Sequence, residues 1–219
     1  LGEIMIKRVI FDIDNTLIPW ENEYNEEIKK ALEDLNINYT ELDYEQINKA
    51  LAEYENVYYT FDKKIMLNYI NKYTNKQYPI EFIYNILKRW SKCIPDKIDE
   101  NIIETLKYLQ KKYEMVILTD WFAEEQINRL ECLGIKKYFT QVYSAEKTKR
   151  KPFKEAFINA IGNNKPEECV MIGDNLERDI KGAINAGLKA IHFNPNNKEN
   201  NTNTEYITIS RLEQLIKIL

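Results

Sequence analysis

The chain has 219 residues, of which 44% are hydrophobic and 30% charged, a balance typical of a globular protein with a sizeable core. Its formal net charge of -4 provides no overall positive field to attract nucleic acid or an anionic membrane. No apolar stretch approaches the roughly 20 residues that span a bilayer, and the first residues show no signal-peptide pattern. Three widely separated cysteines, without a Cys-x-x-Cys pair, favour the cytoplasm and indicate neither a disulfide framework nor a zinc site.

The first predicted strand ends in two carboxylates. Residues 9–11 are Val, Ile and Phe, and Asp12, Ile13, Asp14 and Asn15 follow. Alternate residues of an extended chain share a face, so Asp12 and Asp14 point the same way if the strand continues and diverge if the chain bends at Asn15. Either arrangement places two carboxylates at the exit of a buried strand. An ordinary polar turn explains this segment equally well when it is taken alone.

Residues 19–94 carry a helical pattern. Apolar residues recur with helical spacing in four segments, near residues 28–35, 47–58, 65–73 and 82–90. The polar breaks at 36–43, 60–62 and 74–79 are typical of short turns. We therefore expect a compact helical domain over 19–94, inserted into a domain made of residues 1–18 and 95–219.

From residue 95 onward, predicted helices and strands alternate. Strands are expected at 115–118, 139–145, 169–172 and 190–193, a loop at 194–204 and a closing helix at 212–219. Strands that alternate with helices pair in parallel, with helices on both faces of the sheet. The fold class predicted is α/β, with a Rossmann-like parallel sheet and the α-helical insert as a second domain.

Polar residues follow three of these strands where each ends. They are Asp12 and Asp14 after the first strand, Thr119 after the second and Asp174 after the fourth. Ligands of parallel sheets bind beyond the carboxyl ends of the strands. This convergence favours a catalytic site over a set of unrelated polar turns. His192, the single histidine, lies within the last of these strands, where we expect a hydrogen-bonded structural role.

Four separated motifs resemble, in order, those of the haloacid dehalogenase (HAD) superfamily. They read D-I-D-N-T-L at 12–17, L-T-D at 118–120, K-P-F-K at 151–154 and G-D-N-L-E-R-D-I at 173–180. With the helical insert after the first motif, the resemblance covers essentially the whole chain. It implies a phosphatase-type hydrolase with a HAD-like α/β catalytic core and a helical cap domain.

The resemblance also implies roles for individual residues. Asp12 would be the nucleophile that forms an aspartyl-phosphate, and Asp14 would be the general acid and then the general base. A magnesium ion would be bound by Asp12, the backbone carbonyl of Asp14 and Asp174, with Asp179 in the outer shell. Because an attacking carboxylate and a phosphoester are both negative, the site needs this cation and a lysine.

The phosphate would be bound by Thr119, by the backbone N–H of Asp120 and by Lys151. Asp120 stands where the family usually has Asn, so we expect its carboxylate to turn away from the phosphate. Three further basic residues, Lys147, Lys149 and Arg150, precede Lys151. The proline that follows Lys151 favours it as the lysine of the site.

The predicted function is therefore Mg²⁺-dependent hydrolysis of a small soluble phosphomonoester, of the nucleotide or sugar phosphate class. A phosphomutase or other phosphotransferase of the same superfamily is the alternative. A haloacid dehalogenase fits less well, because hydrolytic dehalogenases of the superfamily lack the second aspartate that Asp14 supplies. A non-catalytic binding module is the least favoured hypothesis, since no required side chain is missing.

Overall fold

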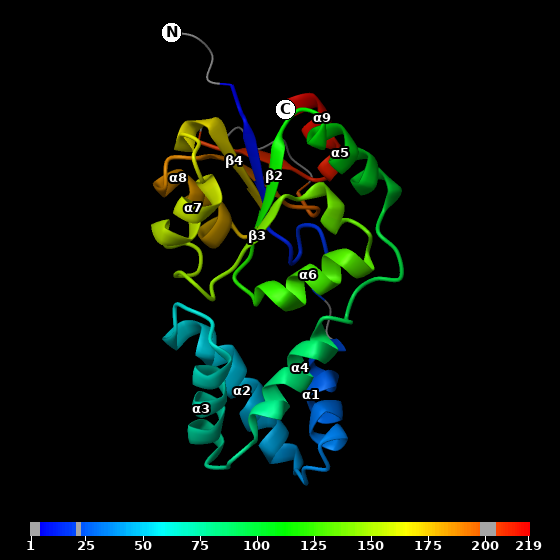
Figure 1. The fold of residues 1–219 in the computed structure, drawn as a ribbon, viewed down its shortest axis with the longest axis vertical. Helices are drawn as coiled ribbons and strands as arrows, with labels where there is room; N and C mark the ends of the chain where they lie inside the picture. The colour runs from blue at the N-terminus through cyan, green and yellow to red at the C-terminus, as the bar shows by residue number, and fades with distance from the viewer. Residues whose placement is uncertain (1–4, 21–22, 198–204) are drawn as a thin grey trace. The chain divides into compact units, whose positions relative to one another are not determined.

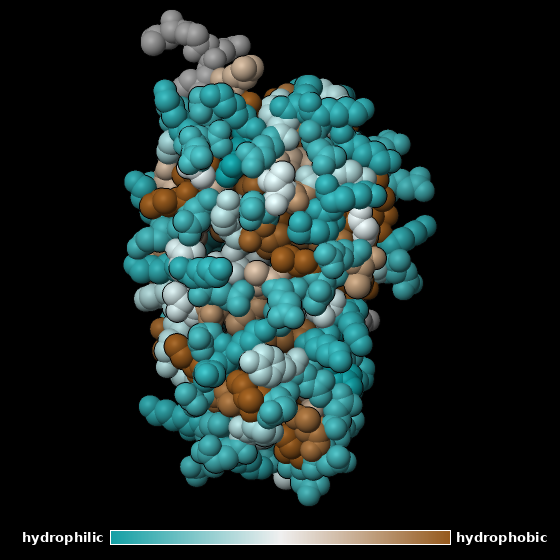
Figure 2. Space-filling view, viewed as in Figure 1, coloured by the Kyte–Doolittle hydropathy of each residue, from teal (hydrophilic) through white to brown (hydrophobic). Residues whose placement is uncertain are grey.

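The computed structural model describes residues 5–20, 23–197 and 205–219. The chain divides into two compact units, one of residues 1–20 and 95–219 and the other of residues 21–94. Part of the loop expected at 194–204 lies outside the described residues. Figure 2 shows a face covered largely by hydrophilic side chains, with small hydrophobic patches between them. Among the described helices, none combines the length and the apolar character needed to cross a membrane.

A parallel sheet forms the centre of the first unit (Figure 1). In the described residues it has six strands in the order β3-β2-β1-β4-β5-β6. Their bounds are β1 Arg8–Phe11, β2 Glu114–Leu118, β3 Gln141–Tyr143, β4 Cys169–Gly173, β5 Lys189–Phe193 and β6 Ile207–Ile209. The predicted α/β class with parallel pairing is confirmed. β3 is shorter than the predicted strand at 139–145 and follows a 3-10 turn at Lys136–Tyr138, and β6 was not predicted.

The central strand β1 is buried along its whole length and pairs on both sides. Phe11, its last residue, pairs with Ile117 of β2 and with Ile172 of β4. The residues that follow these three strands therefore emerge at one edge of the sheet. This register brings segments far apart in the sequence to the same place.

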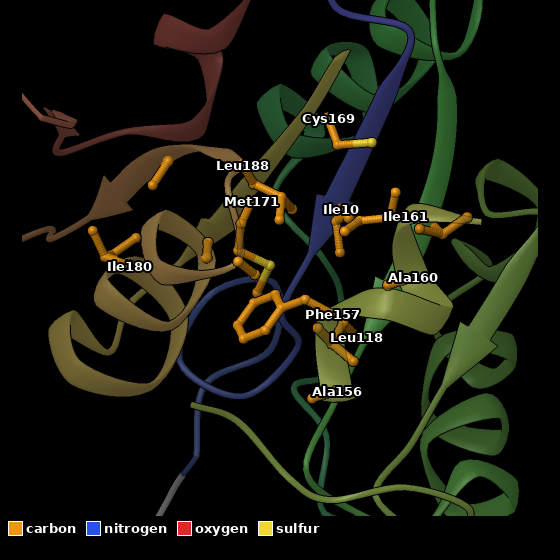
Figure 3. Packing of buried hydrophobic residues seen from close by; sticks show 14 residues of the cluster. Ile10, Leu118, Ala156, Phe157, Ala160, Ile161, Cys169, Met171, Ile180 and Leu188 are labelled. Atoms are coloured by element: carbon orange, nitrogen blue, oxygen red, sulfur yellow. The ribbon is translucent and has the colours of Figure 1, made fainter. Parts of the chain in front are cut away.

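The first unit also contains helices, which follow its strands along the chain or, for α5, precede β2. They are α5 Glu100–Gln110, α6 Ala123–Cys132, α7 Lys154–Ile161, α8 Gly182–Asn185 and α9 Leu215–Ile218, with a turn of π-helix at Leu176–Lys181 before α8. On one face of the sheet, Ile10 of β1 and Leu118 of β2 belong to a buried cluster with Phe157 and Ala160 of α7 (Figure 3). The predicted closing helix is shorter than expected, since residues 212–214 form a 3-10 turn.

The second unit consists, in its described part, of four helices. They are α1 Glu23–Asp34, α2 Glu41–Val57, α3 Lys63–Thr74 and α4 Ile80–Trp90. Apolar residues at the predicted spacing are buried between them, among them Ile28, Ile47, Ile70 and Phe82. The helix α2 packs on α3, and α1 packs on α4.

A reciprocal cap begins α2. The N–H and the hydroxyl of Thr40 each donate to Asp43 Oδ2 at 2.8 Å, and the N–H of Asp43 donates back to the Thr40 hydroxyl at 3.3 Å. Lys76 Nζ lies 2.5 Å from the same carboxylate oxygen. The hydrogen bonds from Lys76 and from the Thr40 backbone lower the pKa of Asp43 to about 2. This buried carboxylate therefore ties the start of α2 to the turn after α3.

We predict that Asp43→Asn destabilises the protein at neutral pH by about 1 kcal/mol, since the exposed Lys76 ammonium is partly screened by water. The folded-state pKa lies below the value of about 3.9 of an unfolded chain, so the stabilisation is present above pH 4 and is lost as the pH falls towards 2. Denaturant unfolding should show the difference between wild type and variant shrinking from pH 6 to pH 3. The exposed Glu45→Gln on the same helix is the control, and a pH-independent difference would contradict the prediction.

Candidate active site

The chain bends sharply after β1. Asp12 continues the ladder, since its N–H donates to the carbonyl of Ile172 at 2.9 Å. The carbonyl of Ile13 then accepts from the N–H groups of residues 16, 17 and 18, which closes a tight turn. Asn15 lies in this turn with φ of +60°, a conformation that Asn adopts more readily than most residues. Of the two arrangements considered for Asp12 and Asp14, a continued strand or a bend at Asn15, the structure has the bend.

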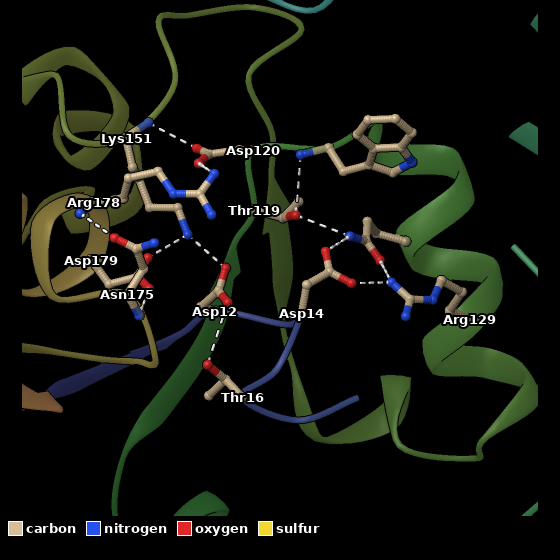
Figure 4. A network of polar contacts seen from close by, with 12 residues as sticks. Asp12, Asp14, Thr16, Thr119, Asp120, Arg129, Lys151, Asn175, Arg178 and Asp179 are labelled. Carbon is tan, nitrogen blue, oxygen red and sulfur yellow. Dashed lines mark hydrogen bonds and ion pairs between the residues drawn. The ribbon is translucent and has the colours of Figure 1, made fainter. Parts of the chain in front are cut away.

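As a result, the carboxylates of Asp12 and Asp14 diverge (Figure 4). Asp12 faces Lys151, whose Nζ lies 2.6 Å from Asp12 Oδ1 and 2.6 Å from Asp179 Oδ1. Lys151 is only 2% exposed. Lys149, one of its basic neighbours, is instead paired with Glu155 at 2.7 Å. The structure thus brings Lys151 together with the carboxylates.

The carboxylate of Asp120 also contacts this segment. Its Oδ1 accepts a hydrogen bond of 2.8 Å from the backbone N–H of Lys151, and Arg178 Nη1 lies 3.6 Å from Oδ2. The Asp120 side chain therefore holds the backbone of residue 151, which carries the buried lysine. Binding of phosphate by the Asp120 N–H stays a prediction.

Three carboxylates gather beside Lys151. Asp12, Asp174 and Asp179 each offer an oxygen atom, and the three atoms lie within 4.8 Å of one another. The group includes Asp179, for which the sequence predicted a position in the outer shell of the metal. The carboxylate of Asp14 is not part of the group. The suggested contribution of the Asp14 backbone carbonyl is therefore still a prediction.

The charges of this group do not balance. When ionised, the three carboxylates carry three negative charges against the one ammonium of Lys151, which contacts Asp12 and Asp179, so two negative charges are in excess. Burial raises the pKa of Asp12 well above its ordinary value, and the negative charges of Asp179 and Asp14 raise it further, against the attraction of Lys151. Burial and Asp179 likewise raise the pKa of Asp174. The carboxylates themselves raise the pKa of Lys151, although burial alone would lower it.

These residues fit a divalent cation. All the donors are carboxylate oxygens, the ligands that Mg²⁺ prefers, and two positive charges would neutralise the group. A pocket of about 580 Å³ adjoins Asp174 and is bordered by Thr16, His192 and residues 194–196. Water and ions can therefore reach Asp174 from this side.

The position of Asp179 depends on a glycine. Asp179 lies in the π-helical turn, and its Oδ2 accepts from the N–H of Asn175 at 2.9 Å. A Cβ atom at Gly173 would lie 2.4 Å from Asp179 Cγ, so any side chain at 173 would displace the carboxylate. The glycine of the fourth motif thus leaves room for the third carboxylate.

His192 contacts the backbone directly after β4. Its Nε2 donates to the backbone carbonyl of Asp174 at 2.9 Å, because a carbonyl can only accept. The ring therefore holds the backbone beside a carboxylate of the cluster. The expected hydrogen-bonded role of His192 is confirmed.

The carboxylate of Asp14 contacts two residues of α6 that the sequence analysis missed. Arg129 Nη1 lies 2.5 Å from Asp14 Oδ1, and Gln126 Nε2 donates to Asp14 Oδ2 at 2.7 Å. Gln126 is fully buried and Arg129 is 2% exposed. Polar residues three positions apart on the buried face of a helix that directly follows Thr119 are a signal that could have identified them.

Comparisons with known proteins identify the family of the chain. The family model described as haloacid dehalogenase-like hydrolase matches residues 9–193. The HAD-hydrolase YfnB of Bacillus subtilis is 26% identical, over 97% of this chain and 95% of that protein. The glyceraldehyde 3-phosphate phosphatase of Methanopyrus kandleri is 29% identical, over 86% of this chain and 84% of that protein.

Solved structures share the fold. The crystal structure of YfnB, bound to magnesium, superposes with a TM-score of 0.72 at 23% identity and covers 98% of both chains. A 2-haloacid dehalogenase from Pseudomonas syringae superposes equally well, with a TM-score of 0.72 at 23% identity and 98% coverage of both chains. The fold alone therefore does not separate phosphatases from dehalogenases. The match over most of the chain nevertheless establishes that the protein belongs to the haloacid dehalogenase-like hydrolase family.

Proposed function

We propose that this hydrolase is a Mg²⁺-dependent phosphatase that hydrolyses a small phosphorylated metabolite, of the nucleotide or sugar phosphate class. The observation that carries the proposal is the group of three carboxylates beside Lys151, two of them buried and the third, Asp174, partly exposed, which has an excess of negative charge. Asp14 supports phosphate chemistry over dehalogenation, because hydrolytic dehalogenases of the superfamily lack this second aspartate. The phosphatase activity of the relative from Methanopyrus kandleri supports the same class of reaction.

In this proposal Asp12 is the nucleophile. A carboxylate oxygen of Asp12 attacks phosphorus, and the bond from phosphorus to the leaving oxygen breaks. Lys151 holds Asp12 Oδ1 at 2.6 Å and therefore restricts the orientation of the carboxylate. A magnesium ion held by Asp12 and Asp174 would offset the repulsion between the nucleophile and the phosphate. Thr119 and the N–H of Asp120 would bind phosphate oxygens.

Asp14 completes the reaction in two proton transfers. It first gives a proton to the leaving oxygen, which departs as an alcohol. It then takes a proton from the water that attacks the aspartyl-phosphate, which frees inorganic phosphate and Asp12. Each step leaves Asp14 in the protonation state that the other step needs.

Further parts of the proposal concern organisation and location. We assign residues 1–18 and 95–219 to the catalytic core and residues 19–94 to a cap domain, supported by the resemblance of the helical insert to HAD caps. A cytoplasmic location is supported by Cys93, Cys132 and Cys169, which are free thiols.

A phosphomutase is the second candidate, since it would use the same aspartates. It transfers the phosphoryl group back to a sugar, whereas a phosphatase releases it to water. Product analysis with a panel of phosphorylated metabolites separates the two, because only the phosphatase releases inorganic phosphate in proportion to substrate consumed.

Replacing the nucleophile should abolish turnover. We expect Asp12→Asn to lower the rate on 4-nitrophenyl phosphate with Mg²⁺ by at least about a thousandfold, since an amide cannot form the phosphoenzyme. Asp96→Asn removes a negative charge from an exposed turn and should retain the wild-type rate. A wild-type rate in Asp12→Asn would disprove the assignment.

Replacing Asp14 should separate the two half-reactions. With an activated aryl phosphate, whose leaving group needs no proton, Asp14→Asn should still form the phosphoenzyme but hydrolyse it roughly 10²–10⁴ times more slowly. Rapid mixing should then show a burst of the aryl alcohol followed by slow release of phosphate. Unchanged steady-state turnover of both aryl and alkyl phosphates would rule out this role.

Binding of the metal can be measured without turnover. Titration calorimetry should detect Mg²⁺ binding to the wild-type protein, and Asp174→Asn should weaken it at least about tenfold because one of three carboxylates is lost. Asp96→Asn again serves as the control with the same change of charge. Equal affinities in Asp174→Asn and the wild type would place the ion elsewhere.

A further inference from the structure

We infer that Gln126 and Arg129 of α6 are positioning residues, which orient the Asp14 carboxylate as a base and the Thr119 hydroxyl as a donor to phosphate. The inference rests on the proposed function, because it concerns the second proton transfer and the phosphate site of that reaction. It is carried by the hydrogen bonds that connect these four side chains (Figure 4).

The side-chain amide of Gln126 is at the centre of these hydrogen bonds. Gln126 Nε2 donates to Asp14 Oδ2 at 2.7 Å and to Thr119 Oγ1 at 3.1 Å. Arg129 Nη1 donates to Gln126 Oε1 at 2.8 Å and lies 2.5 Å from Asp14 Oδ1. The amide thus connects the proposed base with the proposed phosphate ligand.

Arg129 determines which way the amide points. A guanidinium has only donors, so the Gln126 atom that faces it must be the carbonyl oxygen. The two N–H bonds of the amide are then directed towards Asp14 and Thr119. The reversed amide would place donors against the guanidinium and an oxygen against the Asp14 carboxylate, and both contacts would be repulsive.

Both oxygens of Asp14 are held in this way. Oδ1 contacts Arg129 and Oδ2 contacts Gln126, so the carboxylate has a defined plane and direction although it is 26% exposed. Such an oriented carboxylate suits a base that must face the attacking water. Charge-assisted hydrogen bonds are among the stronger ones in proteins, and two of them restrain the side chain more than one.

The hydroxyl of Thr119 is directed by the same amide. Its oxygen accepts from the N–H of Trp121 at 3.2 Å and from Gln126 Nε2 at 3.1 Å. A hydroxyl oxygen has two acceptor positions and one hydrogen, so with both positions used the hydrogen must point to an acceptor elsewhere. A phosphate oxygen is such an acceptor. Gln126 therefore makes Thr119 a donor to the substrate.

The experiment compares the two half-reactions in substituted proteins. Arg129→Met, Arg129→Lys and Gln126→Leu are mixed rapidly with 4-nitrophenyl phosphate and Mg²⁺, and the burst is measured separately from the steady state. Asn128→Ala, at an exposed position of the same helix, is the matched control. Inhibition by inorganic phosphate reports on the phosphate site.

Arg129→Met should keep the burst rate within about threefold and slow the steady state at least about tenfold, because only the second step needs the base. Arg129→Lys should restore part of the lost rate, since an ammonium keeps the charge without the planar fork of donors. Gln126→Leu should have the same effect on the steady state. It should also weaken inhibition by phosphate about tenfold, because the Thr119 hydroxyl is no longer directed and its hydrogen bond to the charged phosphate is lost. Asn128→Ala should match the wild type.

The outcomes distinguish a failure of the positioning roles from a failure of the proposed function. Equal slowing of burst and steady state in both Arg129→Met and Gln126→Leu, or no effect on either, would overturn the positioning roles while the proposed function stands. If the wild-type protein forms no phosphoenzyme that depends on Asp12, the proposed function itself fails. Circular dichroism monitors folding, and if Arg129→Met does not fold, the more conservative Arg129→Lys and the neutral Gln126→Leu still test the network.

Discussion

The ammonium of Lys151 and the two carboxylates that it contacts are the interaction on which the active-site region depends. Removing charges from water is costly, and it is tolerated only when each charge has close partners of opposite sign. Lys151 meets this condition for Asp12 and Asp179 at 2.6 Å each, while Asp120 holds its backbone. One cation cannot balance every carboxylate of the group, and a divalent ion would neutralise the remaining negative charge that otherwise repels an incoming phosphate.

The sheet brings these groups together. β1 lies between β2 and β4, so the residues that follow the three strands emerge side by side at one edge. The chain turns tightly from Ile13 onward, and Asp14 points away from Asp12 and towards α6. Two aspartates only two positions apart thus contact different partners, a buried lysine for one and a glutamine with an arginine for the other. Different partners allow chemically identical side chains to take different roles.

Much of this arrangement follows from sequence patterns. Apolar runs that end in Asp12, Thr119 and Asp174 predict parallel strands whose ends converge, and the proline after Lys151 favours the lysine that is found beside Asp12. The patterns could not predict the direction in which individual side chains point. Whether Asp12 and Asp14 diverge depends on where the chain leaves the extended conformation after Asp12, and the contacts of Gln126 and Arg129 depend on which face of α6 is buried. The strand β6 has only three residues, too few for a periodic signal.

The order of the elements along the chain bears on how the protein is synthesised. β1 emerges from the ribosome before the whole helical unit, yet its partners β2 and β4 begin only at residues 114 and 169. The helices of 21–94 can form from local contacts in that interval, whereas the apolar residues 9–11 must wait for strands made much later. An unpaired strand of this kind is prone to aggregate, and Lys7 before it and Arg8 at its first position provide charge that opposes association. The strand that the proposed nucleophile directly follows is thus the strand that is made first and waits for partners made much later.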